Sequence, residues 1–203
     1  MSPRSEEQNI IIKDERREQI LSAALKLFAT KGFAATKISE IVEKAEMSHG
    51  LVYHYFKSKE EIFYELLKRA IQTSSESILP VEIQSIHPID KVRQIARFIL
   101  GAIENYEDTA YYFLIVVHAS VMENMSKENE ELLYSSNRPM KSMARIVKAG
   151  QEARQICLGD PMEITVSFFA AIQGLAIYKL GMDDFKMPDP DILVNMMRYH
   201  QSL

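Results

Sequence analysis

Hydrophobic residues recur at helical spacing along most of the chain. Ile20, Ala24 and Phe28 lie four residues apart on one face, and Gly32 follows where a helix of this phase would end. A shorter segment of about two turns comes next, with Ile38 facing inward. No alternation of apolar and polar residues typical of strands competes with this pattern. The chain is therefore expected to be all-helical.

Further helices are expected downstream, separated by turn residues. One should run from Lys59 to about residue 78. The others are expected at 89–105, 109–124, 128–157, 161–181 and 189–201. Pro139 should kink or split the segment 128–157, whereas Gly159, Asp160 and Pro161 should end one helix and begin the next. The expected architecture is about nine helices in two domains, a small one at residues 1–58 and a larger one at residues 59–203.

Hydroxyl residues stand where the early helices would begin. Thr36 is a candidate N-cap for the first short helix, and Ser48 for the next. Ser58 and Glu61 have the spacing of a capping box at the start of the longer helix that follows.

Residues 37–56 have the form of a helix-turn-helix, because two short helices joined by a tight turn follow a longer first helix. An isolated helix needs about 12–15 residues to be stable, so the second short helix must rely on packing. Val52 and Phe56, four residues apart, are the side chains that would provide it. Its opposite face is then free to bind another molecule.

That free face carries hydroxyl, imidazole and aromatic side chains and no carboxylate. Its members are Ser48, His49, Leu51, Tyr53, His54 and Tyr55. Gly50 lies among them although glycine costs about 1 kcal/mol in a helix, which indicates close approach of another molecule to the backbone. A nucleic-acid backbone is one such molecule.

Lysines flank this face. Lys37 lies before it, and Lys57 and Lys59 lie after it, so the three are expected to contact phosphates on either side of a major groove. Thr36 and the amides at the start of the first short helix offer a further phosphate site.

Base edges would be contacted by His49, Leu51 and His54, with Leu51 suited to a thymine methyl group. The spacing alone also permits an ordinary helical hairpin whose polar residues are merely solvated.

A specific run of residues favours the first interpretation. It comprises Gly32-Phe33, Thr36, Ile38, Glu40-Ile41, Ala45, residues 47–56 and residues 58–63. This run resembles the DNA-binding segment of TetR-type (tetracycline-repressor-like) transcriptional regulators. The resemblance implies a homodimeric, all-helical repressor with three DNA-binding helices, a linking fourth helix and a ligand-binding, dimerising remainder. It also implies operator contacts at Thr36, Lys37, Ser39, Ser48, His49, Gly50, Leu51, Tyr53, Tyr55 and Lys59.

Two positions depart from the family pattern. Glu46 stands where the family commonly has glycine, so a left-handed backbone there would be mildly strained. Ser39 stands where arginine is frequent, which removes a cation and is expected to change the operator that is read.

Composition limits the classes of protein and the compartment. The 203 residues are 47% hydrophobic and 26% charged, which fits a chain with a buried core. A single cysteine, Cys157, and a charged N-terminus without an apolar run predict a cytoplasmic protein, and no membrane span is expected. The net charge is −4, yet residues 1–69 hold 12 Lys and Arg against 11 Asp and Glu. DNA binding would therefore depend on placed cations and not on bulk charge.

The segment 161–181 is apolar on more than one side, so it needs neighbours on both faces. A second subunit is the expected neighbour, through an intersubunit four-helix bundle with segment 189–201. The expected interface residues are Phe169, Ala170, Gln173, Ala176, Ile177, Ile192 and Met196. A two-fold dimer would bind a near-palindromic operator.

Aromatic and methionine residues between the two ends are candidates for a ligand pocket, although such a set more often forms core. The candidates are Phe98, Tyr106, Tyr111, His118, Met122, Met140, Met143 and Gln173. A small apolar or aromatic inducer is expected there. The alternative for His118 is a hydrogen-bonded interior histidine.

Enzyme motifs are missing from the sequence. Cys157 has no nucleophile motif around it, and the chain has no glycine-rich phosphate loop or metal-ligand spacing. His49 and His54 are five residues apart, about 140° around a helix, so they cannot share one ion. We expect no enzyme activity, cofactor or metal; a helical adaptor protein that binds no DNA is the alternative.

Overall fold

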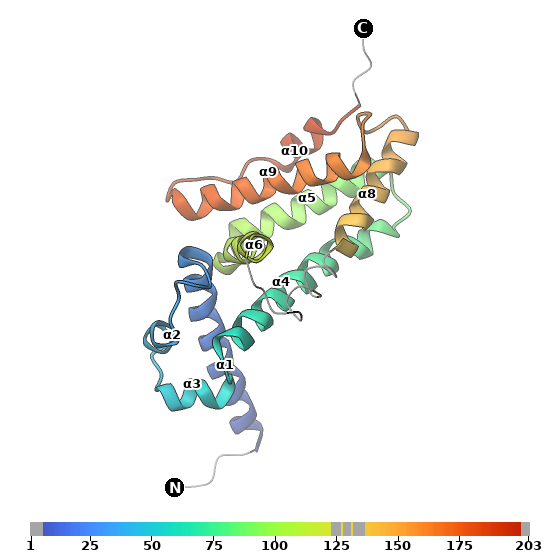
Figure 1. The fold of residues 1–203 in the computed structure, drawn as a ribbon. Helices are drawn as coiled ribbons and strands as arrows, with labels where there is room; N and C mark the ends of the chain where they lie inside the picture. Colours follow the sequence, from blue (N-terminus) through green and yellow to red (C-terminus); the bar gives the residue numbers. More distant parts are fainter. Residues whose placement is uncertain (1–5, 123–126, 128–130, 132–136, 200–203) are drawn as a thin grey trace.

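The computed structural model describes residues 6–122, 127, 131 and 137–199, and this part of the chain contains nine helices and no strand (Figure 1). The helices are α1 (Glu6–Lys31), α2 (Ile38–Lys44), α3 (His49–Tyr55), α4 (Lys59–Glu82), α5 (Pro88–Asn105), α6 (Glu107–Ser120), α8 (Asn137–Glu152), α9 (Pro161–Gly181) and α10 (Pro190–Met196). The all-helical fold expected from the sequence is confirmed.

The lower core holds α1, α2 and α3 against the first half of α4 and the end of α6. The apolar face of α1 predicted from Ile20, Ala24 and Phe28 is completely buried. Phe28 meets the edge of the Phe63 ring at a centroid distance of 5.4 Å. The members of the lower core include Ile20, Leu25, Phe28, Ile41, Val52, Phe56, Ile62, Phe63, Leu66, Ile71, Ile115 and Ala119.

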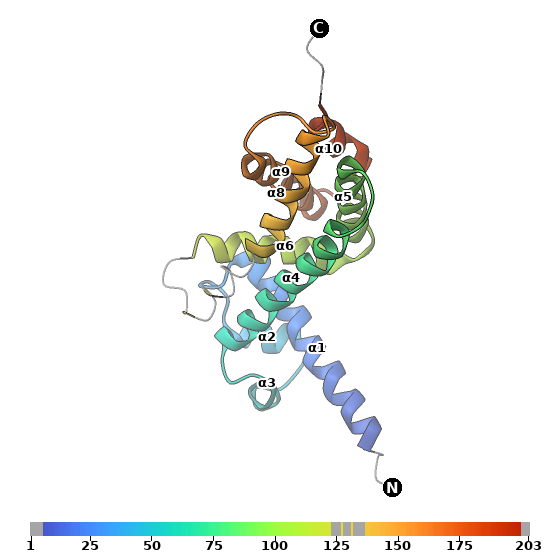
Figure 2. The same ribbon diagram turned by 90° about the vertical axis from the view of Figure 1, so that its right-hand side faces the viewer.

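The upper core lies between α5, α8, α9, α10 and the last turns of α4 (Figures 1 and 2). Its members include Ile78, Val81, Val92, Ile95, Ile99, Ala110, Met143, Val147, Ile156, Phe168, Ile172 and Val194. Figure 2 shows the two groups of helices one above the other, with α1 extending past α3 at the lower end.

Helix α4 runs through both cores. Ile71 belongs to the lower core and Ile78 to the upper core, and the turn between them is polar. In this turn Ser75 donates a side-chain hydrogen bond to the carbonyl of Ile71, at 2.9 Å. The domain boundary expected at residue 58 therefore does not coincide with a division between the cores, because the first half of α4 is part of the lower one.

Helix α6 is the second link. Ala110 lies in the upper core, whereas Ile115 and Ala119 lie in the lower one. Lys26 of α1 donates a hydrogen bond to Glu107 in the first turn of α6, at 2.7 Å.

Several helices differ in length from the prediction. α4 continues through Pro80 to Glu82 because burial of Ile78 and Val81 in the upper core compensates for the one backbone hydrogen bond that proline removes. α6 begins two residues earlier than expected and ends at Ser120. Part of the expected segment 128–157 lies outside the described residues.

The segments that follow α8 and α10 pair with each other. Beyond α8, the backbone of Ile156 pairs with that of Arg198 in an isolated antiparallel bridge. The amide of Tyr199 also donates to the carbonyl of Gln155, at 3.0 Å. The bonds lie beyond the end of α8 at Glu152 and of α10 at Met196. α8 itself ends locally, where Arg154 has a φ of 54° and the Gln155 amide donates to the carbonyl of Gly150.

Prolines begin helices more often than they break them in this chain. Pro139 is the third residue of α8, in the first turn, where an amide has no intrahelical acceptor. The predicted break before α9 is confirmed: the Asp160 carboxylate accepts hydrogen bonds from the amides of Met162 and Glu163, and Pro161 is the first helical residue.

Among the described residues, one helix, α9, is long and apolar enough by length and composition to cross a membrane. In the fold it packs between α6 and α8, with Phe168 and Ile172 buried in the upper core.

Candidate nucleic-acid interface

Helix α3 is held in place from both sides. The hydroxyl of Ser48 caps it by accepting a hydrogen bond from the amide of Leu51, at 3.3 Å, as predicted. Val52 and Phe56 are buried in the lower core. A helix of seven residues is therefore fixed by its cap and by two buried side chains.

The face of α3 that points away from the core is polar and open. Ser48, His49, Gly50, Tyr53 and His54 are exposed. A methyl group on Gly50 would meet no heavy atom within 4 Å, so no neighbour within the described protein requires glycine there. Leu51 and Tyr55 are half-buried at the edges of this face, and the Tyr55 ring meets the ring of His54 edge-on at 5.3 Å.

The turn between α2 and α3 contains the strain that the sequence indicated. Glu46 has a φ of 52°, in the left-handed region that favours glycine. Its amide donates to the carbonyl of Glu43 at 3.0 Å, and the next amide, that of Met47, donates to Val42 at 3.1 Å. These bonds end α2 and direct the chain into α3.

The start of α2 differs from the prediction. Lys37, and not Thr36, is the N-cap residue. Thr36 is only 1% exposed, and its hydroxyl donates to the carbonyl of Gly32 at 2.8 Å, which closes the loop after α1. The predicted cap at Thr36 is therefore wrong, and its hydroxyl is not on the surface that would meet DNA.

A carboxylate takes over the capping. Glu40 accepts a hydrogen bond from the Lys37 amide at 2.8 Å, and Lys31 donates to the same carboxylate at 2.5 Å. The bond from Lys31 is the main reason that the pKa of Glu40 lies below its usual value. Ser39, on the adjoining turn, is exposed.

A shallow hollow of about 460 Å³ lies where α2, α3 and α4 come together. It is lined by Ala34, Thr36, Lys37, Ile38, Tyr53, Lys57, Ser58, Lys59 and Glu60. The structure thus brings the predicted residues Lys37, Tyr53 and Lys57 around one concave surface. An aromatic ring with cations on two sides suits a phosphate and its sugar.

The beginning of α4 forms one wall of this hollow. The Ser58 hydroxyl accepts a hydrogen bond from the Glu61 amide at 3.3 Å, as the predicted cap requires. The Glu61 carboxylate, however, accepts from the amide of Lys57 at 2.6 Å, one residue before the position of a standard capping box. Lys57 is therefore fixed in its backbone, whereas its side chain is exposed.

Lys59 was expected to contact a phosphate, but its ammonium group binds backbone carbonyls of the protein. Its ammonium nitrogen donates to the carbonyls of Phe33 and Thr36, at 2.8 and 2.9 Å. It also lies 4.3 Å from the centre of the Phe33 ring. Its charge is directed into the protein.

The predicted ligand residues do not surround one cavity. Phe98 and Tyr106 are exposed, whereas Met143 is completely buried in the upper core. Met122, Met140 and Gln173 are half-buried.

Two other ligand candidates, His118 and Tyr111, face α1. His118 Nε2 lies 3.0 Å from the carbonyl oxygen of Ala29, as in the alternative of a hydrogen-bonded interior histidine. The ring of Tyr111 lies 5.9 Å from the ammonium of Lys26.

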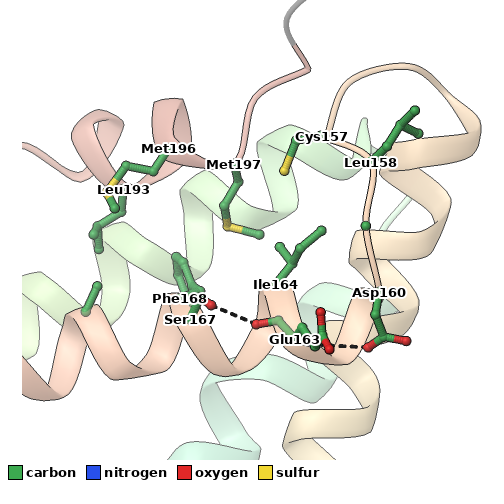
Figure 3. A pocket seen from close by; sticks show the side chains of 12 residues that line it. Cys157, Leu158, Asp160, Glu163, Ile164, Ser167, Phe168, Leu193, Met196 and Met197 are labelled. Atoms are coloured by element: carbon green, nitrogen blue, oxygen red, sulfur yellow. Dashed lines mark hydrogen bonds between the residues drawn. The ribbon is translucent and has the colours of Figure 1, made fainter.

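A cavity of about 370 Å³ lies instead between the start of α9 and α10 (Figure 3). It is lined by Cys157, Leu158, Gly159, Asp160, Glu163, Ile164, Ser167, Phe168, Ala171, Leu193, Met196 and Met197. Sequence reasoning missed it, because it depends on how α10 crosses α9. In the sequence these residues indicated only the start of a helix and a pair of adjacent methionines.

Most of the predicted dimer residues form an outward face. Ala170, Ile177, Ile192 and Met196 are exposed, and Phe169 and Gln173 are half-buried. Ala176 is a correction: it is completely buried within the chain and so is not on this surface. Its side chain belongs to the upper core.

The described chain is thus an all-helical protein with an N-terminal helix-turn-helix whose recognition face is open to solvent. The family model for "Bacterial regulatory proteins, tetR family" matches residues 20–66, which run from the buried part of α1 through the first third of α4. Over these residues the chain is similar to the members of this family.

Curated relatives show the same similarity. The chain is 40% identical over 80 residues to the HTH-type transcriptional regulator HbdR of Aromatoleum sp. (strain CIB), a match that covers 39% of this chain and 34% of HbdR. It is 24% identical over 139 residues to the HTH-type transcriptional repressor NicS of Pseudomonas putida, covering 68% of this chain and 64% of NicS. The chain thus spans about a third of HbdR and under two thirds of NicS.

Solved structures share the whole fold. A tetR-family regulatory protein from Rhodococcus RHA1 superposes with a TM-score of 0.69 at 21% identity, covering 92% of this chain and 98% of that one. AibR, solved in complex with isovaleryl coenzyme A and operator DNA, superposes with a TM-score of 0.71 at 17% identity, covering 90% and 98%. At these identities the similarity establishes the fold.

Proposed function

We propose that this protein is a sequence-specific DNA-binding transcriptional regulator that acts as a homodimeric repressor. The observation that carries the proposal is the outward face of α3, which is polar, free of carboxylates and rigidly held by Val52 and Phe56. A short helix of this kind fits the major groove of B-DNA, where base pairs present distinct hydrogen-bonding patterns.

The residues divide into two roles. Lys37, Lys57 and Tyr53 around the hollow contact backbone phosphates and sugars, which set the register on the duplex. His49, Leu51 and His54 contact base edges. Further contacts come from Ser39, Ser48, Gly50 and Tyr55.

Pairing of two chains completes the DNA-binding unit. The exposed apolar face of α9 and α10, with Ile177, Ile192 and Met196, is the proposed dimer interface. Two α3 helices related by a two-fold axis would lie about 34–36 Å apart and bind a near-palindromic operator. Residues 1–58 would be the DNA-binding domain and residues 59–203 the ligand-binding and dimerisation domain of this cytoplasmic regulator.

A small apolar or aromatic ligand is proposed to release the operator. Two similar structures support a ligand-responsive role: AibR was solved with isovaleryl coenzyme A and operator DNA, and SmeT with triclosan. A ligand that binds the DNA-free arrangement more tightly shifts the population away from the operator-bound state. The relatives are named as transcriptional regulators, and the proposed role requires no enzyme activity.

Selection of bound fragments from a random duplex library tests the proposal. We expect enrichment of a near-palindrome, and binding that weakens steeply with salt because phosphate contacts release counterions. His49→Ala should change the ranking of sites, whereas Tyr53→Ala should weaken all duplexes about equally. Absence of duplex binding at low salt would leave the adaptor alternative.

A further inference from the structure

Lys59 lies in the hollow next to the proposed DNA contacts, yet its ammonium group is used inside the protein. Two of its three N–H donors go to the carbonyl oxygens of Phe33 and Thr36, at 2.8 and 2.9 Å. The charge lies 4.3 Å from the centre of the Phe33 ring, within the range of a cation–π interaction. At most one donor remains for a phosphate.

The two carbonyls belong to the loop between α1 and α2. Thr36 directly precedes Lys37, the N-cap of α2, and its buried hydroxyl closes the loop on Gly32. Phe33 is anchored in turn by the ring of Phe63, at a centroid distance of 5.0 Å. The loop is thus tied on one side to the aromatic part of the core and on the other to the first residue of α4.

This arrangement determines where two exposed lysines lie. Lys37 follows the tied loop, and Lys57 precedes Lys59 by two residues, so the tether joins the segments that carry both. Both lysines line the same hollow. Phosphates have fixed positions on a duplex, so two lysines bind them well only if the distance between the lysines is fixed as well.

We infer that Lys59 is a positioning residue that fixes Lys37 relative to Lys57, and that it does not itself bind phosphate. This inference rests on the proposed function, since it concerns how the DNA-binding surface is assembled. It reverses the role that the position of Lys59 in the sequence suggested.

The test measures affinity for a random-sequence duplex of fixed length over a series of salt concentrations. Lys57→Met is the matched control, because it removes an exposed lysine of the same hollow. It should weaken binding and lower the slope of log K against log salt by about 0.9, the value for one lost phosphate contact. Lys59→Met should weaken binding about tenfold while changing the slope by less than half as much.

Two further readouts separate positioning from a general loss of stability. Lys59→Arg should restore most of the affinity, because a guanidinium can donate to both carbonyls and stack on the Phe33 ring. In spectra of protein labelled with nitrogen-15 at the lysine side chains, the Lys59 ammonium signal should be visible without DNA and should not shift when duplex is added, whereas that of Lys57 should shift. Lys59→Gln, which keeps one donor, replaces Lys59→Met if the latter fails to fold.

The outcomes are distinct. A slope change in Lys59→Met equal to that in Lys57→Met, or an Lys59 signal that moves with DNA, overturns the inference while leaving the proposed function in place. Unchanged affinity in Lys59→Met also overturns it. If the unmodified protein binds no duplex, the proposed function itself fails, and the positioning role fails with it.

Discussion

The guanidinium of Arg69 on α4 donates two hydrogen bonds to the carboxylate of Glu18 on α1, at 2.5 and 2.7 Å. The pair is bidentate, the geometry that makes arginine–carboxylate contacts directional. The bond from Arg69 is the main reason that the pKa of Glu18 is lowered, and Glu18 in turn raises the pKa of Arg69. The contact links the first helix of the helix-turn-helix to the helix that leads into the upper core.

We expect this pair to contribute modestly to stability. Glu18 keeps 55% of its side chain exposed, so solvent screens the interaction and a coupling free energy of about 0.5–1 kcal/mol is expected. A double-mutant cycle with Glu18→Gln and Arg69→Met, followed by urea denaturation, measures it. A coupling of zero would mean that the contact has no energetic role in joining the helices.

Stability should fall as the pH is lowered below about 4.5, the usual pKa of these carboxyl groups. Glu18 and Glu82 both have lowered pKa values, the latter chiefly because Arg145 donates a hydrogen bond to it. The folded protein therefore holds fewer protons than the unfolded chain, so the stabilisation is present above this pH and is lost as the pH falls through the folded-state pKa values. Urea midpoints recorded between neutral and acidic pH check the direction. In a Glu18→Gln, Glu82→Gln variant the midpoint should fall less as the pH is lowered.

Glu46→Gly should stabilise the protein by about 0.5–1 kcal/mol, because a left-handed backbone carries a penalty for any residue with a Cβ atom. The φ of 52° at Glu46 provides the reason. Glu43→Gly is the matched control, since Glu43 is an exposed residue within α2 and the same change there should destabilise by about 1 kcal/mol. The melting temperature should therefore rise in Glu46→Gly and fall in Glu43→Gly.

Two glycine-to-alanine changes should also act oppositely. A methyl group on Gly150 would clash with Cδ1 of Ile156 and lie 2.6 Å from its Cγ1, and Ile156 is completely buried, so Gly150→Ala should destabilise by about 1–3 kcal/mol. Gly101, inside α5, has no heavy atom within 4 Å of such a methyl group. Gly101→Ala should stabilise by up to about 1 kcal/mol, and equal effects at both sites would contradict the close contact at Ile156.

Ile177→Glu should separate the proposed dimer. Ile177 is 51% exposed on α9, and a carboxylate placed there would have to be buried unpaired on pairing, which should weaken self-association about a hundredfold or more. Phe98→Glu is the control, because Phe98 is 56% exposed but lies on α5, which is not part of the proposed interface. Sedimentation velocity distinguishes the two, and a dimer that persists in Ile177→Glu would place the interface elsewhere.

The sequence predicted those features that depend on neighbouring residues along the chain. The break at Asp160 and Pro161, the cap at Ser48 and the strained turn at Glu46 all follow from local rules of helix ends, and all three are present. Burial of the apolar side of α1 followed from helical spacing in the same way.

Features that depend on contacts between distant segments were not predictable in this way. The carbonyls that bind Lys59 come from residues 23 and 26 positions earlier, so the spacing of lysines could not reveal that its charge is directed inward. The bridge between Arg198, after α10, and Ile156 likewise joins positions far apart in the sequence. The ligand candidates were chosen by residue type, and the fold distributes them between the surface, the upper core and the contact with α1.

Because α4 and α6 each contribute side chains to both cores, two continuous helices join the lower core to the upper one. These two helices are the physical connection through which a change of packing in the upper core would reach α3. Between the two cores, the hydroxyls of Ser75 and Ser77 donate to carbonyls of α4 itself, a kind of bond that often bends helices. Replacing the serines of this turn of α4 with alanine would straighten the helix, and a change in the upper core would then move α3 by a larger amount.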